Sequence, residues 1–197
     1  LARSSTMAQP YRNDFFLTDL VLRRSWGDYE LTASVGYADQ YVFERFEGLA
    51  LFDIENSLLA PEADAPVASY FQGNDQSMLT AEARLARHGP DGTGWMIAAS
   101  LLRNEARLER LMEVSFAPDP LTGVSNIVEE ATVYGEATIA ASERLNLTFG
   151  GRLSHSKLSS KVIDPVLPDL IYFFDPQAGE SRKETEFLPS LALAYQW

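Results

Sequence analysis

Between positions 29 and 38 the chain alternates, residue by residue, between larger apolar side chains and small or polar ones. The first set is Tyr29, Leu31, Ala33, Val35 and Tyr37, and the second is Glu30, Thr32, Ser34, Gly36 and Ala38. In an extended chain neighbouring side chains point to opposite faces, so a period of two predicts a β-strand with one apolar and one polar face. Such a strand needs a partner surface for its apolar face.

The alternation returns along the chain, and with less regular extended segments it predicts about seven strands. They cover 15–22, 29–38, 79–86, 95–107, 133–139, 145–154 and 187–197. A helix over Met78–Arg87 or Arg103–Met112 is the alternative, because Ala, Leu, Arg and Glu dominate both stretches and favour helices.

Short and long connections alternate between these strands. The short ones are Gly27-Asp28, 88–94 and 142–144. The long ones are Tyr41 to Asp75, Leu108 to Val128 and Ser159 to Glu184. Outer-membrane barrels sort their connections in this way, with short periplasmic turns and long extracellular loops. We therefore expect an all-β chain of antiparallel up-and-down strands with long loops on one side, forming part of a transmembrane β-barrel. An odd strand count favours a piece of a barrel, since bacterial barrels have even counts.

Composition narrows the functions that this chain can serve. The chain is 46% hydrophobic, with a net charge of −12 and a pI near 4.5, which excludes a disordered tail and argues against a nucleic-acid partner. It has no Cys, hence no disulfide framework, and no apolar run long enough for a transmembrane helix. The start, 1–7, lacks a secretory signal, and we expect the chain to begin within a longer product.

Only a closed barrel satisfies backbone polar groups in hydrocarbon, so each strand should offer one face to lipid and one to the lumen. The expected lipid-facing residues are Tyr29, Leu31, Val35, Leu145, Leu147, Phe149, Leu191 and Leu193. The expected lumen-facing residues are Glu30, Thr32, Glu82, Arg84, Glu136, Asn146, Thr148 and Arg152. Trp26, Tyr29, Tyr195 and Trp197 suit an aromatic girdle at the periplasmic interface. The alternative is a half-buried soluble sheet, which shows the same alternation.

The charged and titratable residues do not predict catalysis. His155 lies between Ser154 and Ser156, but neighbours in a strand point to opposite faces and cannot form a Ser–His pair. Two distant histidines make a poor metal site, and the glycines at 89–94 lack a phosphate-loop ending. We expect no enzyme activity, no cofactor and no metal site.

Two groups of charges surround the predicted loops. The acidic residues of the first long connection are read as solvated, although they could bind cations; they are Glu44, Glu47, Asp53, Glu55, Glu62, Asp64 and Asp75. Arg103, Arg107 and Arg110 could form a basic patch for an anionic ligand. The intervening Glu105 and Glu109 favour a salt-bridged loop base instead.

Several segments, in order along the chain, resemble the barrel of TonB-dependent outer-membrane receptors. The clearest is 133–152 (VYGEATIAASERLNLTFGGR), which is similar to the strand–turn–strand signature of that family. The pair 78–87 (MLTAEARLAR) and 95–102 (WMIAASLL), the strand 186–195 (EFLPSLALAY) and 29–37 also resemble strands of this barrel.

The resemblance implies that 1–197 is a segment of a single barrel domain of about 22 strands, without the plug domain, the energy-coupling box and the remaining strands. It implies a bacterial outer-membrane location and uptake of a scarce nutrient such as siderophore iron, a vitamin or a carbohydrate. The implied partners are outer-membrane lipid, the plug, the other strands and the energy-coupling TonB complex. The isolated segment should self-associate through its edge strands.

Two other functions stay open on the sequence. A complete small outer-membrane barrel of structural or adhesive role would explain the ending 191–197, if an eighth strand lies within 41–71. A soluble ligand-binding β-barrel or sandwich would pack its apolar face on itself and remain monomeric without detergent.

Overall fold

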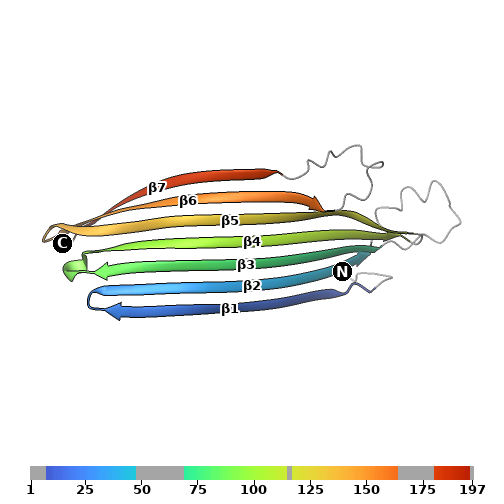
Figure 1. Cartoon of the computed structure of the whole chain (residues 1–197), viewed down its shortest axis with the longest axis horizontal. Helices are drawn as coiled ribbons and strands as arrows, with labels where there is room; N and C mark the ends of the chain where they lie inside the picture. Colours follow the sequence, from blue (N-terminus) through green and yellow to red (C-terminus); the bar gives the residue numbers. More distant parts are fainter. Residues whose placement is uncertain (1–7, 48–68, 115–116, 164–179, 196–197) are drawn as a thin grey trace, which may run out of the picture.

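The computed structural model describes residues 8–47, 69–114, 117–163 and 180–195. These residues form one antiparallel sheet of seven strands in sequence order, which confirms the predicted up-and-down arrangement (Figure 1). The strands are β1 (Tyr11–Trp26), β2 (Tyr29–Glu47), β3 (Ser69–His88), β4 (Gly94–Val114), β5 (Ala117–Ser142), β6 (Leu145–Ile163) and β7 (Ser181–Tyr195). Among these residues the sheet is open, since β1 pairs with β2 alone and β7 with β6 alone.

The three short connections lie together at one end of the sheet (Figure 1). Gly27 has a φ of 55° in the β1–β2 turn, a conformation that glycine adopts without steric cost. The β3–β4 connection holds a single 3-10 turn, Pro90–Gly92. The β5–β6 turn follows a register shift between Ala140 and Ser142. Short turns and alternating strands thus give the hairpins that the sequence predicts.

The predicted long connection from Leu108 to Val128 is wrong. β4 continues to Val114 and β5 begins at Ala117, and the two strands stay paired with one register shift between Arg110 and Leu111. The alternation of apolar and polar side chains fades in this stretch, although the backbones of β4 and β5 stay paired. Alternation is needed only where one face of a strand contacts lipid or a protein core, whereas backbone pairing does not depend on it. The other two long connections are shortened by strand ends, and their centres lie outside the described residues.

The helical alternative is also wrong. Met78–Arg87 lies in β3 and Arg103–Met112 lies in β4, each paired on both sides. Helix propensity is a weak preference, and two flanking strands supply hydrogen bonds that override it.

The register assigns every side chain to one of two faces, because directly paired residues share a face. The row Leu22, Ala33, Ala83, Ala99, Val133, Leu153 and Phe187 crosses all seven strands. We call the face that carries this row the apolar face, and the opposite one the polar face. All eight residues expected to face lipid lie on the apolar face.

The described residues enclose almost no apolar core. The buried hydrophobic side chains among them are Ala86 and Ala98, whereas large side chains of the apolar face stand open, with Leu193 68% and Leu191 66% exposed. A soluble sheet would cover such a surface, because exposing it to water costs roughly 25 cal/mol per Å². The described strands pack on no second layer, so the soluble alternative gains no support.

Candidate functional site

The candidate functional surfaces are the two faces of the sheet. On the apolar face, the part nearest the short turns carries aromatic rings in contact. The Trp26 and Tyr29 rings stack with centroids 6.0 Å apart, and Tyr29 meets Trp95 edge-on at 6.3 Å. The Tyr195 side chain lies at the same end on β7 and is 59% exposed, while Trp197 lies outside the described residues. Tyr and Trp in this position are typical of a membrane–water interface.

Beyond the aromatic rings, β2 carries no charged residue on the apolar face from Leu31 to Tyr37, and Asp39 follows. On the neighbouring strand β1, Arg24 lies opposite Leu31 at the short-turn end of this stretch. From Tyr29 to Tyr37 the strand rises about 27 Å at ~3.4 Å per residue, or ~20 Å across a membrane at a typical tilt of about 40°. A band of this height approaches the ~25 Å apolar band of transmembrane barrels.

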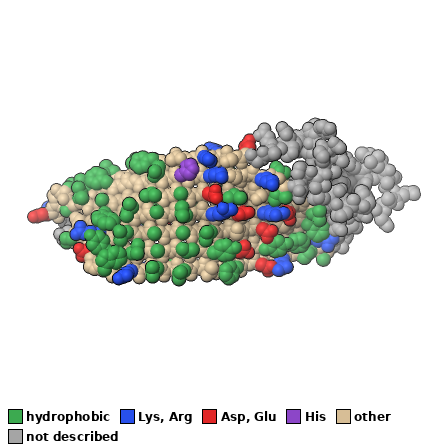
Figure 2. Space-filling view, viewed as in Figure 1, with side chains coloured by type: hydrophobic (Ala, Val, Ile, Leu, Met, Phe, Trp, Pro, Cys, Tyr) green, Lys and Arg blue, Asp and Glu red, His purple; other side chains and the backbone are tan. Residues whose placement is uncertain are grey.

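A charged belt begins where the apolar band ends, toward the long connections. We define it by residues of the apolar face: Arg12, Asp14, Asp39, Asp75, Arg103, Glu105, Arg107, Glu109, Glu129, Lys157, Lys161 and Lys183. Figure 2 shows mainly hydrophobic side chains over the part of the sheet near the short turns, with a few charged ones at that end, and a denser group of charged side chains beyond them.

Ion pairs are frequent in the charged belt. Arg103 contacts Glu129 at 3.2 Å and Glu105 at 3.5 Å, and Arg107 pairs with Glu109. The predicted salt-bridged cluster is therefore present, within strand β4 rather than a loop base. The three-arginine basic patch is not formed, because the register places Arg110 on the polar face opposite Gln72.

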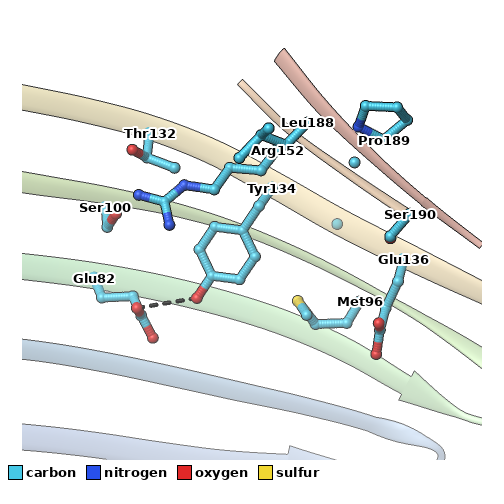
Figure 3. A pocket seen from close by; sticks show the side chains of 12 residues that line it. Glu82, Met96, Ser100, Thr132, Tyr134, Glu136, Arg152, Leu188, Pro189 and Ser190 are labelled. Carbon is cyan, nitrogen blue, oxygen red and sulfur yellow. Dashed lines mark hydrogen bonds between the residues drawn. The ribbon is translucent and has the colours of Figure 1, made fainter. Parts of the chain in front are cut away.

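The polar face carries a hydrogen-bonded network that skips over β4. The Tyr134 hydroxyl on β5 donates to Glu82 Oε2 on β3 at 3.0 Å (Figure 3). Ala98 and Ser100 lie between them on β4, and their small side chains leave space for the tyrosine ring. Ala98 is 3% exposed. Three strands are thus tied by one side chain.

A second part of the network joins β5 to β6. Arg152 Nη2 donates to Glu130 Oε1 at 2.8 Å, and its Nε donates to Ser154 Oγ at 2.9 Å. Thr132 Oγ1 contacts Glu130 Oε1 and Ser154 Oγ, each at 2.9 Å. Thr132 is 3% exposed, whereas the side chains of Arg152 and Glu130 are 51% and 30% exposed, so the cluster has a buried hydroxyl beneath a solvent-accessible ion pair.

The two parts of the network border a hollow of about 470 Å³ on the polar face. Side chains from β3 to β7 line it, and Figure 3 shows Arg152, Tyr134 and Glu82 on one side and Met96 and Glu136 on the other. A cation, two carboxylates and a phenol around one hollow can hold a polar side chain or ligand group by charge-assisted hydrogen bonds.

All five predicted site residues lie on the polar face, and three of them border the same hollow. Glu82, Glu136 and Arg152 line the hollow. Glu30 and Arg84 pair with each other at 3.8 Å instead, on β2 and β3. Sequence reasoning missed Glu130, Thr132 and Tyr134, although each is an even number of residues from Glu136 on the same strand. This even spacing is the sequence signal that could have placed them on the polar face.

Catalytic and metal-binding arrangements receive no support from the described residues. They contain no cluster of three or more His, Cys, Asp or Glu side chains that could hold a metal ion. The His155 ring contacts Thr185 at 2.8 Å on the apolar face, whereas Ser154 lies on the polar face. The predicted separation of this His from its neighbouring serines is confirmed.

An open antiparallel sheet with an apolar band, a charged belt and a polar opposite face is typical of the wall of a transmembrane β-barrel. The family model described as "TonB dependent receptor-like, beta-barrel" matches residues 3–197. The chain therefore belongs to the TonB-dependent receptor β-barrel family, a family of transport receptors rather than enzymes. No curated protein matches the sequence. No helix among the described residues is long and apolar enough to cross a membrane.

Similar solved structures come from the same class of receptors. The ferric yersiniabactin uptake receptor FyuA from Yersinia pestis superposes with a TM-score of 0.59 at 14% identity. The match covers 94% of this chain and 26% of FyuA, so this chain spans about a quarter of that receptor. The fold alone is shared at this identity.

Two further structures match more weakly. The copper transporter OprC has a TM-score of 0.43 at 15% identity, with 95% of this chain and 35% of OprC covered. The alcaligin outer membrane receptor FauA from Bordetella pertussis has a TM-score of 0.42 at 12% identity, with 94% of this chain and 33% of FauA covered.

Proposed function

We propose that this chain is a wall segment of an outer-membrane receptor that takes up a scarce nutrient. The observation that carries the proposal is the apolar face, which presents exposed Leu191, Ile97 and Phe149 between an aromatic end and a charged belt. Such a face is stable against hydrocarbon and costly in water. The family match over residues 3–197 gives the receptor class.

The rest of the barrel would come from other parts of a longer protein. The open edges of β1 and β7 each leave backbone groups without a strand partner among the described residues, and these edges would pair with the remaining strands. In this proposal residues 1–197 belong to one barrel domain, and the plug domain fills its lumen. The energy-coupling TonB complex would act through that parent protein.

The polar face would line the lumen in this arrangement. Glu30, Glu82, Arg84, Glu136 and Arg152 are the proposed lumen-facing residues. The Arg152–Glu130 pair and the Tyr134–Glu82 hydrogen bond support this orientation, since a charge facing the lipid midplane would cost roughly 2–4 kcal/mol. The hollow beside them would receive a polar side chain of the plug.

The nutrient would be an iron chelate, a vitamin or a carbohydrate. FyuA is a ferric yersiniabactin receptor, and an iron chelate is for that reason the first ligand to test.

Membrane fractionation tests the proposed function directly. Antibodies raised against residues 69–114 should detect a protein several times larger than 21.9 kDa in outer-membrane fractions, with mobility on gels that changes on heating.

Deletion of the gene should abolish growth on one chelated iron source while growth on free iron persists. A soluble band would contradict the membrane location, and normal growth of the mutant on every tested chelate, vitamin and carbohydrate would contradict nutrient uptake.

A further inference from the structure

The two faces of the sheet exchange their character beyond the apolar band. On the internal strands β2 to β6 the register aligns three rows of polar-face residues at this level. They are the even-numbered residues of 38–42, 74–78, 104–108, 124–128 and 158–162, and none of them has an ionisable side chain. The odd-numbered residues between them lie on the apolar face and contribute to the charged belt Asp39, Asp75, Glu105, Arg107 and Lys161. We call the even-numbered set the uncharged zone.

Most of the uncharged zone is apolar. Nine of its fifteen side chains are Ala, Val, Leu or Met. The other six are Gln40, Asn74, Gln76, Asn104, Asn126 and Ser160. Gln76 Nε2 donates to Asn104 Oδ1 at 3.2 Å, while Met78 and Leu158 stay 36% and 42% exposed. The zone therefore offers apolar contact area and a few hydrogen-bonding groups to a molecule in front of it.

Ionised residues border the uncharged zone on the same face. Glu130 lies next to it toward the short turns, and Glu44 and Arg110 lie next to it toward the long connections. On the edge strand β7, Arg182 lies beside the zone and pairs with Glu184. Between these borders the zone extends about 19 Å across its five strands and about 14 Å along them, at typical strand spacing and rise. The lack of charge is thus confined to one patch.

The dimensions and the lining of this patch suit a small molecule. Ligand sites in proteins are mainly apolar, with a small number of polar groups that fix the orientation of the ligand. A charged ligand would lose hydration against the zone without meeting an opposite charge, and a sugar chain would press most of its hydroxyl groups against aliphatic side chains; both are costly. A molecule without net charge, with apolar surface and a few amide or hydroxyl groups, matches the zone.

We propose that the uncharged zone contacts the nutrient during uptake and selects a molecule of this class, without net charge and partly apolar. The inference rests on the proposed function, in which the polar face lines the lumen. The zone then lies toward the end that carries the long connections, which is extracellular in outer-membrane barrels. A nutrient that enters from outside would meet the zone before the charged network around Arg152.

Uptake by cells tests the class of nutrient. A strain lacking the gene, and the same strain complemented with the full-length protein that carries this chain, are given four probes. These are a neutral ferric trihydroxamate, cyanocobalamin, a trianionic ferric tricatecholate and maltohexaose. The first two carry no net charge and combine apolar surface with amide or hydroxyl groups. Complementation should restore uptake of one of these two and of neither the tricatecholate nor maltohexaose.

Binding to the purified full-length protein tests the zone itself. Asn126 lies in the middle row of the zone on β5, so N126D and N126K place a charge of either sign against the nutrient that the uptake experiment identifies. Both variants should raise its Kd about tenfold, because a charge without a partner in a contact is costly. The matched controls S125D and S125K place the same charges on the neighbouring residue of the other face, at the level of the charged belt. They should change the Kd by less than about twofold.

Each outcome decides the proposal. Uptake of the tricatecholate or of maltohexaose instead would overturn the selection of an uncharged nutrient and leave the proposed function standing. A wild-type Kd in both Asn126 variants would overturn the role of the zone, and so would opposite effects of N126D and N126K, which would indicate a charged nutrient. Protease cleavage of the plug in N126D but not in S125D would show that the zone packs on the plug, and would overturn the proposal too. Complementation that restores uptake of none of the four probes would contradict the proposed function, and this inference with it.

Discussion

The same seven strands present two surfaces with opposite chemistry. On the apolar face, neighbouring large side chains such as Leu191 and Leu193 stand open and lack polar partners. On the polar face, Arg152, Glu130 and Tyr134 are tied across strands by hydrogen bonds of 2.8–3.0 Å. Consecutive residues of one strand thus meet different environments. The period of two, rather than the identity of any motif, therefore decides which face of the sheet each side chain occupies.

The largest expected effect comes from placing a charge on the apolar face. Phe149→Arg should destabilise the folded parent protein by roughly 2–4 kcal/mol, because the guanidinium would enter hydrocarbon. The adjacent Thr148→Arg is the matched control on the polar face, where the change removes the 2.8 Å contact with Thr138 and should cost about 1 kcal/mol. Urea unfolding in lipid vesicles measures both. Equal costs would contradict the assignment of the two faces.

A methyl group should be costly where strands approach closely on the apolar face. A Cβ on Gly135 would lie 2.7 Å from the Met96 carbonyl oxygen, whereas a Cβ on Gly73 would have no heavy atom within 4 Å. Gly135→Ala should therefore lower the free energy of unfolding by about 1–3 kcal/mol, and Gly73→Ala should leave it nearly unchanged. The same vesicle assay compares them, and a harmless Gly135→Ala would refute the close approach of β4 and β5.

Removing the hydroxyl that bridges three strands should have a smaller effect. Tyr134→Phe deletes the 3.0 Å hydrogen bond to Glu82 and should cost about 1 kcal/mol. Tyr37→Phe deletes a 3.3 Å bond to Asp39 on the same strand. The Tyr37 hydroxyl lies at the boundary between the apolar band and the charged belt, where water replaces the lost partner, so the change should cost a few tenths of a kcal/mol. If Tyr37→Phe cost more, the polar-face network would not be a stabilising feature.

The smallest expected effect concerns ion pairs. A double-mutant cycle on Arg152 and Glu130, with Gln at each position, should give a coupling of about 0.5–1 kcal/mol. The same cycle on Arg107 and Glu109, an exposed pair within one strand, should give less than about 0.3 kcal/mol. Both couplings come from denaturation curves of the four variants. A larger value in the charged belt would reverse the ranking of the two surfaces.

Much of the fold could be predicted because alternation survives wherever one strand face meets an apolar medium. The predicted segments 29–38 and 145–154 are such cases, and they lie within the observed strands β2 and β6. The sequence predicts a loop over 108–128, because outside the apolar band the side-chain pattern no longer reports on backbone pairing. Pairing between β4 and β5 continues there regardless.

The candidate site was less predictable than the fold. The alternation of side chains within each strand predicts that Glu82, Glu136 and Arg152 share one face of the sheet, and the strand register confirms this. The contact between Tyr134 and Glu82 depends on the register of two successive strand pairs and on the small size of Ala98. The offset between distant strands is not encoded in any local pattern, so this part required the structure.

The proposed function requires that the apolar face meets lipid and the polar face meets water. The 197 residues contain no Cys, so single cysteines can be introduced at successive positions from 146 to 153 in the parent protein and spin-labelled in outer-membrane vesicles. Collision with oxygen should be high at Leu147, Phe149 and Leu153, and collision with an aqueous nickel complex high at Asn146, Thr148 and Arg152. Equal access to the aqueous reagent at all these positions, without a period of two, would contradict this orientation of the two faces.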